Sequence, residues 1–358
     1  MSGIAINGRY LTQGMTGVQR FATEIVAAAD TLAVAGEWPA ARVLHPAGAR
    51  DAGLRAFRAE PVGSRSGQAW EQIDLPRALR GDVLVNLGNT APVFAGSRQA
   101  VVIHDAGAFD TPDSYSLAFR TWYRLLQKRL ARGGAKILTV SEFSRGRIAA
   151  ALGMDAAGIG VLPEGGEHVL RIPADGAVLA KHGLAPARYA LVVGNPAAHK
   201  NLSALTAAAE VLGRHGLVLA VAGAADPAVF RAGGGVAADA GRVLGRVSDA
   251  ELRALYENAL CLVFPSRYEG FGLPPLEAMV CGCPVVAAHA GAVPEVCGPA
   301  ALWFDPAQPT TLGEALTRLI EEDGLRDGMR SAGLLRARDF TWDRAARALL
   351  AQLRGFGA

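Results

Sequence analysis

CLVFPSRYEGFGLPPLEAMVCGCP, residues Cys261–Pro284, is the stretch from which the fold and the chemistry of this chain are most directly predicted. Its apolar opening, CLVFP, predicts a buried strand, and GFGL predicts the loop that leaves it. Pro274 and Pro275 suit the first turn of a helix, where no backbone donor is lost. Glu269 is therefore expected in the loop and Glu277, eight positions later, in the first helical turn.

This turn combines binding groups for two kinds of ligand. Free N–H groups at a helix start, with glycines that let the backbone approach closely, bind phosphate or another oxygen-rich ligand. A carboxylate repels phosphate, but an ionised Glu accepts the hydrogen bonds that a vicinal diol donates. Amides for phosphate, with carboxylates for sugar hydroxyls, are the arrangement that a nucleotide sugar requires.

The stretch resembles the Glu-x7-Glu motif of family 4 glycosyltransferases, and the similarity continues through VVAAHAGAVPEVCGPAALWFDP. The resemblance implies a retaining enzyme of the GT-B fold, an α/β architecture of two Rossmann-like doubly wound domains facing a central cleft. It also implies that Glu269 contacts the donor sugar and that Glu277 contacts the ribose of the nucleotide. The alternative is an ordinary strand, loop and helix with two solvated acids.

The length of 358 residues, about half of them hydrophobic, suits two ordinary domains. Gly, Pro and mixed charge between about Val161 and Pro186 indicate the connection between them. We expect a Rossmann-like acceptor-binding domain over residues 1–168 and a Rossmann-like nucleotide-sugar-binding domain over residues 186–338. The resemblance implies that a terminal helix, residues 339–358, crosses back to the first domain. In the connection, Glu164 replaces the Asn of the family's usual Pro-Asn-Gly.

The formal net charge of +3 is small, which argues against bulk nucleic-acid binding. The N-terminus, MSGIAINGRYLTQG, lacks a basic region followed by an apolar core, so we expect no signal peptide. No apolar run approaches the roughly 18 to 20 residues that span a bilayer. We therefore expect a cytoplasmic protein, and peripheral contact with the cytoplasmic face of the inner membrane stays open.

All four cysteines, Cys261, Cys281, Cys283 and Cys297, lie in the C-terminal half of the chain. A reducing compartment argues against disulfides. Together with His289 their spacing matches no familiar zinc site. We interpret them as small apolar residues of the core.

Strand-like runs alternate with helical ones along the first domain, as in a doubly wound parallel sheet. The first run, in GIAINGRYL, leads into TQGMTGVQR, a turn whose glycines allow backbone amides to approach an anion. The resemblance implies that Gly14 and Gly17 face the cleft near the acceptor or the donor phosphate. A tight strand-to-helix turn without a ligand is the alternative.

His104 follows a strand-like run at its carboxyl end, which is where ligands bind in such sheets. Its ring donates or accepts according to its tautomer, so it can hold a hydroxyl or stabilise a developing positive charge. The run VVIHDAGAF resembles the family's strand that ends in His-Asp, which implies that His104 lies against the donor sugar. A histidine that is merely packed at a strand end is the alternative.

The run SLAFRTWYRLLQKRLAR, residues 116–132, predicts a helix that carries both aromatic and basic side chains. Such a helix can lie on an anionic membrane surface, which would suit a lipid-linked acceptor. It can equally pack an apolar face on the core and leave a solvated basic side. Both interpretations stay open.

YALVVGNPAAHKNLSALTAAAEVL predicts the strand, loop and helix that open the second domain. Lys200 is expected at the helix start, where the dipole disfavours a cation and a bound diphosphate would remove the conflict. The family has the same Lys-Asn pair, which implies that Lys200 grips the donor diphosphate and that Gly194 lies in the binding loop. Where many members carry an Arg, this loop has Pro196, so His199 or another Arg takes that role or the contact is missing.

Two further groups complete the expected donor site. RVLGRVSDAEL resembles the family's turn that passes the nucleotide base, which implies contacts from Gly245 and Arg246. Backbone amides at the start of the 273–280 helix, with Lys200, would hold the charge of the leaving nucleotide. These amides belong to Gly270, Phe271, Gly272 and Leu273.

The sequence contains no Asp-x-Asp, the pattern that supplies metal ligands in the other large glycosyltransferase fold, so we expect no metal and no cofactor. It also shows no carboxylate pair of the kind used by retaining glycosidases. Our hypothesis is a front-face transfer with retention, in which His104 and Glu269 position the donor sugar.

The predicted function is hexose transfer from a nucleotide sugar to a glycan or polyprenyl-diphosphate-linked acceptor in cell-surface polysaccharide biosynthesis. The resemblance favours GDP-mannose as the donor. Two alternatives stay open: a GT-B sugar-nucleotide epimerase or hydrolase, and a non-catalytic partner that binds a nucleotide sugar.

Overall fold

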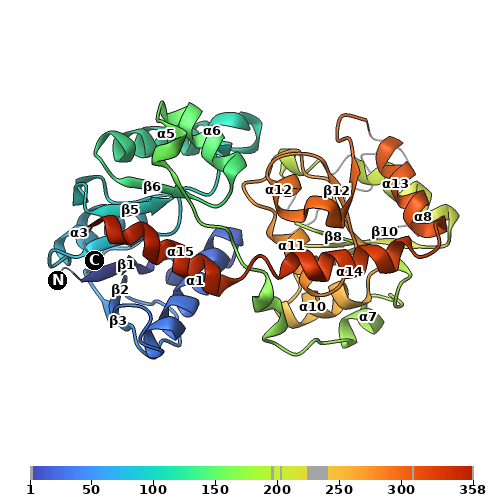
Figure 1. Cartoon of the computed structure of the whole chain (residues 1–358), viewed down its shortest axis with the longest axis horizontal. Coiled ribbons are helices and arrows are strands. Elements are labelled where there is room, and N and C mark those ends of the chain that lie inside the picture. Colours follow the sequence, from blue (N-terminus) through green and yellow to red (C-terminus); the bar gives the residue numbers. More distant parts are fainter. Residues whose placement is uncertain (1–2, 195–196, 202–203, 224–240, 309, 357–358) are drawn as a thin grey trace. The chain divides into compact units, whose positions relative to one another are not determined.

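The computed structural model describes residues 3–194, 197–201, 204–223, 241–308 and 310–356. The chain forms two compact units, shown in Figure 1, and each is described by itself. Unit 1 comprises Met1–Gly165 together with Trp342–Ala358, and unit 2 comprises Gly166–Thr341. The first segment of unit 1 thus ends before the expected boundary at residue 168. Residues 161–165 of the expected connection belong to unit 1, and residues 166–186 belong to unit 2.

Unit 1 is built on a parallel sheet of seven strands in the order β3-β2-β1-β4-β5-β6-β7. Strands β1 and β4 lie at its centre and are buried on both faces, as their continuous apolar runs predict. The strands are β1 Ile4–Asn7, β2 Ala41–His45, β3 Arg58–Pro61, β4 Val83–Asn86, β5 Gln99–Val102, β6 Lys136–Thr139 and β7 Gly160–Val161.

The helices of unit 1 follow the predicted alternation. The run WEQIDLPRALR is helical as far as Arg77, with a π-helical segment, η2 Trp70–Asp74, between the short α-helices α2 and α3. The α-helices are α1 Gly17–Val34, α2 Gly67–Ala69, α3 Leu75–Arg77, α4 Gly107–Asp110, α5 Leu117–Arg132, α6 Glu142–Leu152 and α15 Trp342–Leu353. The 3-10 turns are η1 Gly8–Thr12, η3 Val93–Ala95, η4 Pro112–Ser114, η5 Ala156–Gly158 and η10 Arg354–Phe356.

Unit 2 contains a parallel sheet of six strands in the order β10-β9-β8-β11-β12-β13. The strands are β8 Tyr189–Val193, β9 Val218–Ala222, β10 Gly241–Gly245, β11 Cys261–Phe264, β12 Val285–Ala288 and β13 Ala301–Phe304. The α-helices are α7 Ala177–Lys181, α8 Leu205–Arg214, α10 Asp249–Asn258, α11 Leu273–Val280, α12 Val293–Cys297, α13 Thr310–Glu321 and α14 Leu325–Ala337. The 3-10 turns are η6 Glu167–Leu170, η7 Ala198–Lys200 and η9 Gly298–Ala300. The loop expected over AADPAVFRAGGGVAADAG lies almost entirely outside the described residues.

Both sheets share the strand order of a doubly wound, Rossmann-like fold, which confirms the predicted fold class. In unit 1 the order reverses between β1 and β4, and in unit 2 it reverses between β8 and β11. Ligands of such sheets bind beyond the carboxyl ends of the strands at this reversal. The stretch that begins with β11 therefore leads directly to the expected binding edge of unit 2.

The terminal helix is interrupted, which the sequence pattern did not predict. Helix α14 ends at Ala337 in unit 2, and α15 begins at Trp342 in unit 1. Phe340 packs on Phe271 with ring centroids 5.8 Å apart, whereas the fully buried Trp342 packs on Phe21 at 5.9 Å. Phe340 thus packs in unit 2 and Trp342 in unit 1, and the chain is not helical between Ala337 and Trp342.

The described helices include none whose length and hydrophobicity would allow it to cross a bilayer.

Trp342→Ala is expected to lower the free energy of unfolding by about 3 to 5 kcal/mol, because it leaves a large cavity between α15 and α1. Urea unfolding followed by circular dichroism measures the change. The matched control is Trp122→Ala on α5, where 41% of the side chain is exposed. An effect of Trp342→Ala no larger than that of the control would contradict the anchoring role of Trp342.

Candidate functional site

The turn from β11 to α11 has the predicted strand, loop and helix, with prolines in the first helical turn. Gly272 caps the helix with φ of +109°, a left-handed conformation that favours glycine. The helix begins at Leu273, so Glu277 is its fifth residue. Glu277 was expected in the first helical turn but lies beyond it. Its carboxylate is therefore not one of the groups at the helix start.

Lys200 and Glu269 form an ion pair across the reversal of the unit 2 sheet. Lys200 Nζ donates to Glu269 Oε1 at 2.6 Å, and the two side chains are 19% and 15% exposed. The ammonium also lies 5.7 Å from the centroid of the Phe264 ring. One residue thus follows β8 and the other follows β11, as the fold requires for a site at this edge.

The expected conflict between Lys200 and a helix dipole is absent. Lys200 ends the 3-10 turn η7, and helix α8 begins only at Leu205. The cation is paired with the Glu269 carboxylate. The expected contact of Lys200 with a diphosphate stays a prediction.

Glu277 has different partners from Glu269. Its Oε1 lies 2.9 Å from Nε2 of His168, and its Oε2 accepts a hydrogen bond of 3.0 Å from the Tyr256 hydroxyl. Burial, followed by the charge of Glu277, raises the pKa of Tyr256 well above its usual range, so the hydroxyl remains a donor. Sequence reasoning missed His168 and Tyr256, because one lies in a Gly-rich connection and the other on a buried helix face.

Glycines mark the carboxyl ends of three unit 2 strands, and two of them, Gly194 and Gly245, were expected. Gly194, with φ of +155°, follows β8, and its N–H donates to Ala222 O at the end of β9. A Cβ on the neighbouring Gly223 would lie 2.2 Å from Gly194 O, so only glycine permits this approach. Gly245, with φ of +68°, ends β10 and accepts from the N–H of Gly223 at 2.7 Å. Arg246 follows directly.

A further glycine brings the loop after β12 against Glu269. A Cβ on Gly291 would lie 2.7 Å from Glu269 N, and Ala292 N donates to Glu269 O at 3.1 Å. This contact holds the backbone of Glu269. Gly270 and Phe271 complete the loop, and Phe271 is buried against Phe340.

His104 lies in unit 1, directly after β5, and protein groups hold it on several sides. Its Nε2 lies 3.0 Å from Leu87 O, and its ring packs edge-on against Phe21 at 4.8 Å. A carbonyl only accepts, so Nε2 carries a proton and Nδ1 faces Glu164 at 3.7 Å. Glu164, which stands where the family pattern has Asn, is therefore a close neighbour of the His104 ring.

Gly14 and Gly17 occupy the loop before α1 and the first residue of that helix. A Cβ at either position would meet no heavy atom within 4 Å, so the packing of unit 1 does not demand glycine there.

Unit 1 also contains a buried polar cluster that sequence reasoning missed. Asn7 Nδ2 donates to Glu71 Oε1 at 2.8 Å and to Asn86 Oδ1 at 2.9 Å. Arg9 pairs with Glu71 at 3.3 Å and donates to Thr90 at 2.8 Å. These residues surround the reversal between β1 and β4. They come from separate parts of the sequence, so no local pattern connected them.

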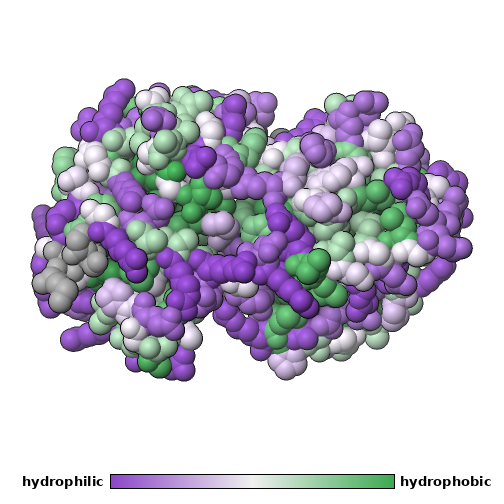
Figure 2. Space-filling model, in the orientation of Figure 1, coloured by the Kyte–Doolittle hydropathy of each residue, from purple (hydrophilic) through white to green (hydrophobic). Residues whose placement is uncertain are grey.

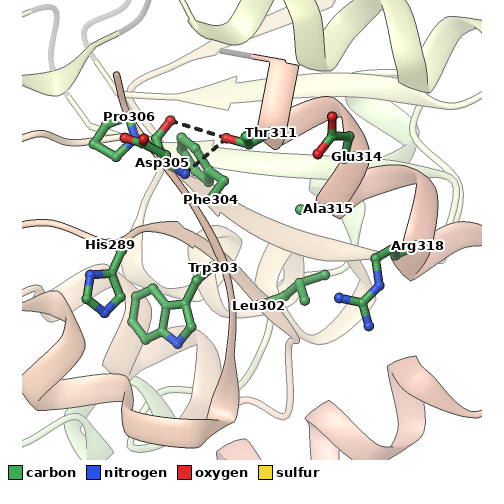
Figure 3. A pocket seen from close by; sticks show the side chains of 10 residues that line it. All are labelled: His289, Leu302, Trp303, Phe304, Asp305, Pro306, Thr311, Glu314, Ala315 and Arg318. Carbon is green, nitrogen blue, oxygen red and sulfur yellow. Dashed lines mark hydrogen bonds between the residues drawn. The ribbon is translucent and has the colours of Figure 1, made fainter. Parts of the chain in front are cut away.

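A hollow of about 510 Å³ lies between β13 and α13. Figure 3 shows Trp303 and His289 at one side of it and Asp305, Thr311 and Glu314 at another. Its charged side chains Glu314 and Arg318 are exposed, and Arg318 pairs with Glu322. None of the residues expected to bind the donor lines it.

Comparison with known proteins places these features in a family context. The family described as "Glycosyl transferases group 1" matches residues 180–336. The chain is 34% identical over 259 residues to O-antigen chain mannosyltransferase B of Escherichia coli, covering 69% of this chain and 67% of that protein. It is 30% identical over 241 residues to O-antigen chain mannosyltransferase RfbU of Salmonella typhimurium, covering 64% of each. Sucrose-phosphate synthase of Thermosynechococcus elongatus superposes with a TM-score of 0.75 at 17% identity over 99% of both chains.

The four cysteines are free and buried around the 261–297 stretch. Burial raises the pKa of Cys261 and of Cys297 to about 12 and that of Cys281 and Cys283 further above the usual range. The thiolate is the reactive form, so its fraction stays small at pH 8 in the folded protein.

Iodoacetamide at pH 8 is expected to leave the native protein unlabelled and to label all four cysteines in urea, where the thiol pKa returns to about 8.5. Intact-mass spectrometry counts the labels. Rapid labelling of the native protein at pH 8 would contradict the burial of these thiols.

Proposed function

Because the chain belongs to the group 1 family of glycosyl transferases, we propose that it transfers a hexose from a nucleotide sugar to a glycan or lipid-linked acceptor in cell-surface polysaccharide biosynthesis. The observation that carries the proposal is the Lys200–Glu269 ion pair at the reversal of the unit 2 sheet. The names of the O-antigen mannosyltransferase relatives favour GDP-mannose as the donor.

The donor binds by an exchange of partners. Its diphosphate takes the Lys200 ammonium, and the Glu269 carboxylate, released from the ion pair, accepts from a sugar hydroxyl. The amides of Gly270–Leu273 at the start of α11 donate to the phosphate oxygens. Glu277 accepts from the ribose hydroxyls. Gly194, Gly245 and Arg246 approach the nucleotide along the same strand ends.

The transfer is front-face, retaining and independent of metal. The bond between the anomeric carbon and the phosphate oxygen breaks as the acceptor oxygen bonds to the same face. The acceptor's proton moves to the departing phosphate oxygen, so no enzymic base is needed. Lys200 and the α11 amides stabilise the charge of the leaving diphosphate. The absence of Asp-x-Asp from the sequence supports this assignment.

Unit 1 supplies the acceptor side of the reaction. His104 positions the donor sugar through Nδ1, since its Nε2 is bonded to Leu87. Gly14 and Gly17 have open space beside their α-carbons, which suits backbone contact with an acceptor or a phosphate.

We also propose peripheral contact with an anionic membrane through helix α5. Leu117, Trp122 and Leu125 of this helix are 71%, 41% and 60% exposed, and its last turn carries Arg129 and Arg132. In Figure 2 the surface over α5 mixes hydrophobic and hydrophilic residues. Exposed apolar and basic side chains on one helix are typical of binding at the membrane interface. A lipid-linked acceptor would be reached from that surface.

Lys200→Ala and Glu277→Gln are each expected to lower turnover by about 100-fold or more, because each removes a group that holds the donor. Donor sugars are screened by thermal shift with GDP-, UDP- and dTDP-sugars, since a ligand at 100 times its Kd stabilises by ~2.7 kcal/mol. Turnover is measured as glycan product. The charge-matched control is Lys181→Ala, an exposed lysine of unit 2 paired with Glu251.

The site assignment fails if both variants stay within a few-fold of the parent protein in donor binding and turnover. Release of free sugar without an acceptor would indicate a hydrolase. Binding without turnover across many acceptors would indicate a non-catalytic partner.

Trp122→Ala combined with Leu125→Ala is expected to remove most co-sedimentation with vesicles that contain phosphatidylglycerol, because the apolar anchors of α5 are lost. The matched control is Leu334→Ala with Leu335→Ala, exposed apolar residues on α14 of unit 2. Salt should weaken the binding of the parent protein. Equal sedimentation of parent and α5 variant would show that α5 is not the contact.

A further inference from the structure

Glu277 is a buried carboxylate held by side chains from two other elements. His168 comes from η6, Tyr256 from α10, and Glu277 itself from α11. The His168 and Glu277 side chains are 5% and 10% exposed, and Tyr256 is fully buried. A carboxylate removed from water in this way is stable only when its oxygens are hydrogen-bonded.

The hydrogen-bond distances indicate which atoms of His168, Tyr256 and Glu277 donate and which accept. The Tyr256 hydroxyl donates to Oε2, and burial raises the pKa of Tyr256 far above neutrality, so the hydroxyl keeps its proton. The Nε2 atom of His168 faces Oε1 at 2.9 Å and donates to it. Each carboxylate oxygen thus uses one acceptor position on the protein. An ionised carboxylate has about four such positions, so about two remain for a ligand.

The two donors are themselves held in place. Gly166 lets η6 approach α11, since a Cβ there would lie 2.7 Å from Cγ of Leu276 and 3.0 Å from Cγ2 of Val280. Arg253 of α10 donates to Leu170 O and to Ile172 O, each at 2.9 Å, which ties the end of η6 to α10. The three elements therefore form one framework with Glu277 at its centre.

We propose that His168 and Tyr256 are positioning residues that make Glu277 a reader of the nucleotide's ribose. With one lone pair of each oxygen held by the protein, the carboxylate is fixed in rotation. Its two remaining positions then match the spacing of the vicinal 2′- and 3′-hydroxyls, both of which donate. The site consequently selects ribonucleotides over 2′-deoxyribonucleotides. This inference rests on the proposed function, in which Glu277 contacts the ribose.

The test is the ratio of the dissociation constants of a nucleoside diphosphate and its 2′-deoxy form, measured by calorimetry with GDP and 2′-deoxy-GDP and with UDP and 2′-deoxy-UDP. The parent protein is expected to prefer the ribose form of the diphosphate it binds by about 10-fold or more, the effect of one hydrogen bond to a charged acceptor. Tyr256→Phe and His168→Leu are expected to reduce this preference to a few-fold. His168→Gln, which keeps a donor near the Nε2 position, should retain most of it.

Tyr189→Phe is the matched control. Tyr189 is also fully buried in unit 2, and its hydroxyl donates to Leu255 O of the same helix α10 at 2.6 Å. Loss of the Tyr189 hydroxyl should lower the thermal stability about as much as Tyr256→Phe and His168→Leu do. It should leave the preference for the ribose form unchanged. If His168 and Tyr256 only stabilise the fold, substitutions at His168, Tyr256 and Tyr189 should all have the same effect on the preference for the ribose form.

Glu277→Gln separates this inference from the proposed function. If Glu277→Gln abolishes the preference while Tyr256→Phe and His168→Leu retain it, Glu277 reads the ribose without their help and the inference is overturned. If Glu277→Gln also retains the preference, the proposed ribose contact fails and the inference with it. Loss of the preference in all three variants, with Tyr189→Phe unaffected, supports the inference.

Discussion

Pairing of buried carboxylates is the constraint on which both units depend. A charge removed from water must be neutralised or hydrogen-bonded, and breaking a buried pair costs about 3 to 5 kcal/mol. Glu71 is held by Asn7 and Arg9 in unit 1, and Glu277 by His168 and Tyr256 in unit 2. The partners of each carboxylate are far from it in the sequence. The carboxylate therefore links separate elements, β1, η1 and η2 in unit 1 and η6, α10 and α11 in unit 2.

Glu269 differs from these two because its partner is a lysine in a partly exposed ion pair. Its ion pair with Lys200 is partly exposed, and both residues lie at the strand reversal where ligands of this fold bind. A diphosphate and a sugar hydroxyl together satisfy the same two charges without leaving either unpaired. In the function that we propose, the pair thus occupies the place of the donor and holds both side chains in position before the donor binds.

The two units carry related sites on the same topology. In each sheet the order reverses beside the first strand, and polar groups gather at that reversal: Arg9 and Thr90 in unit 1, Lys200 and Glu269 in unit 2. In unit 1 the sequence predicted His104, Gly14 and Gly17 as site residues, but not the cluster around Arg9 and Glu71. The residues of the unit 2 site lie in a motif-bearing loop, whereas Arg9 and Glu71 are single polar residues that come together only through the sheet and the π-helical turn.

The sequence by itself determined the features that depend on local pattern. Apolar runs predicted the central strands and the prolines predicted the start of α11, because strand burial and helix initiation involve neighbouring residues. Only the tertiary structure decided which donors hold Glu277, which carboxylate pairs with Lys200, and that the terminal helix is interrupted between Ala337 and Trp342. Those outcomes depend on contacts between residues many positions apart, and no local periodicity records which distant side chain will satisfy a buried charge.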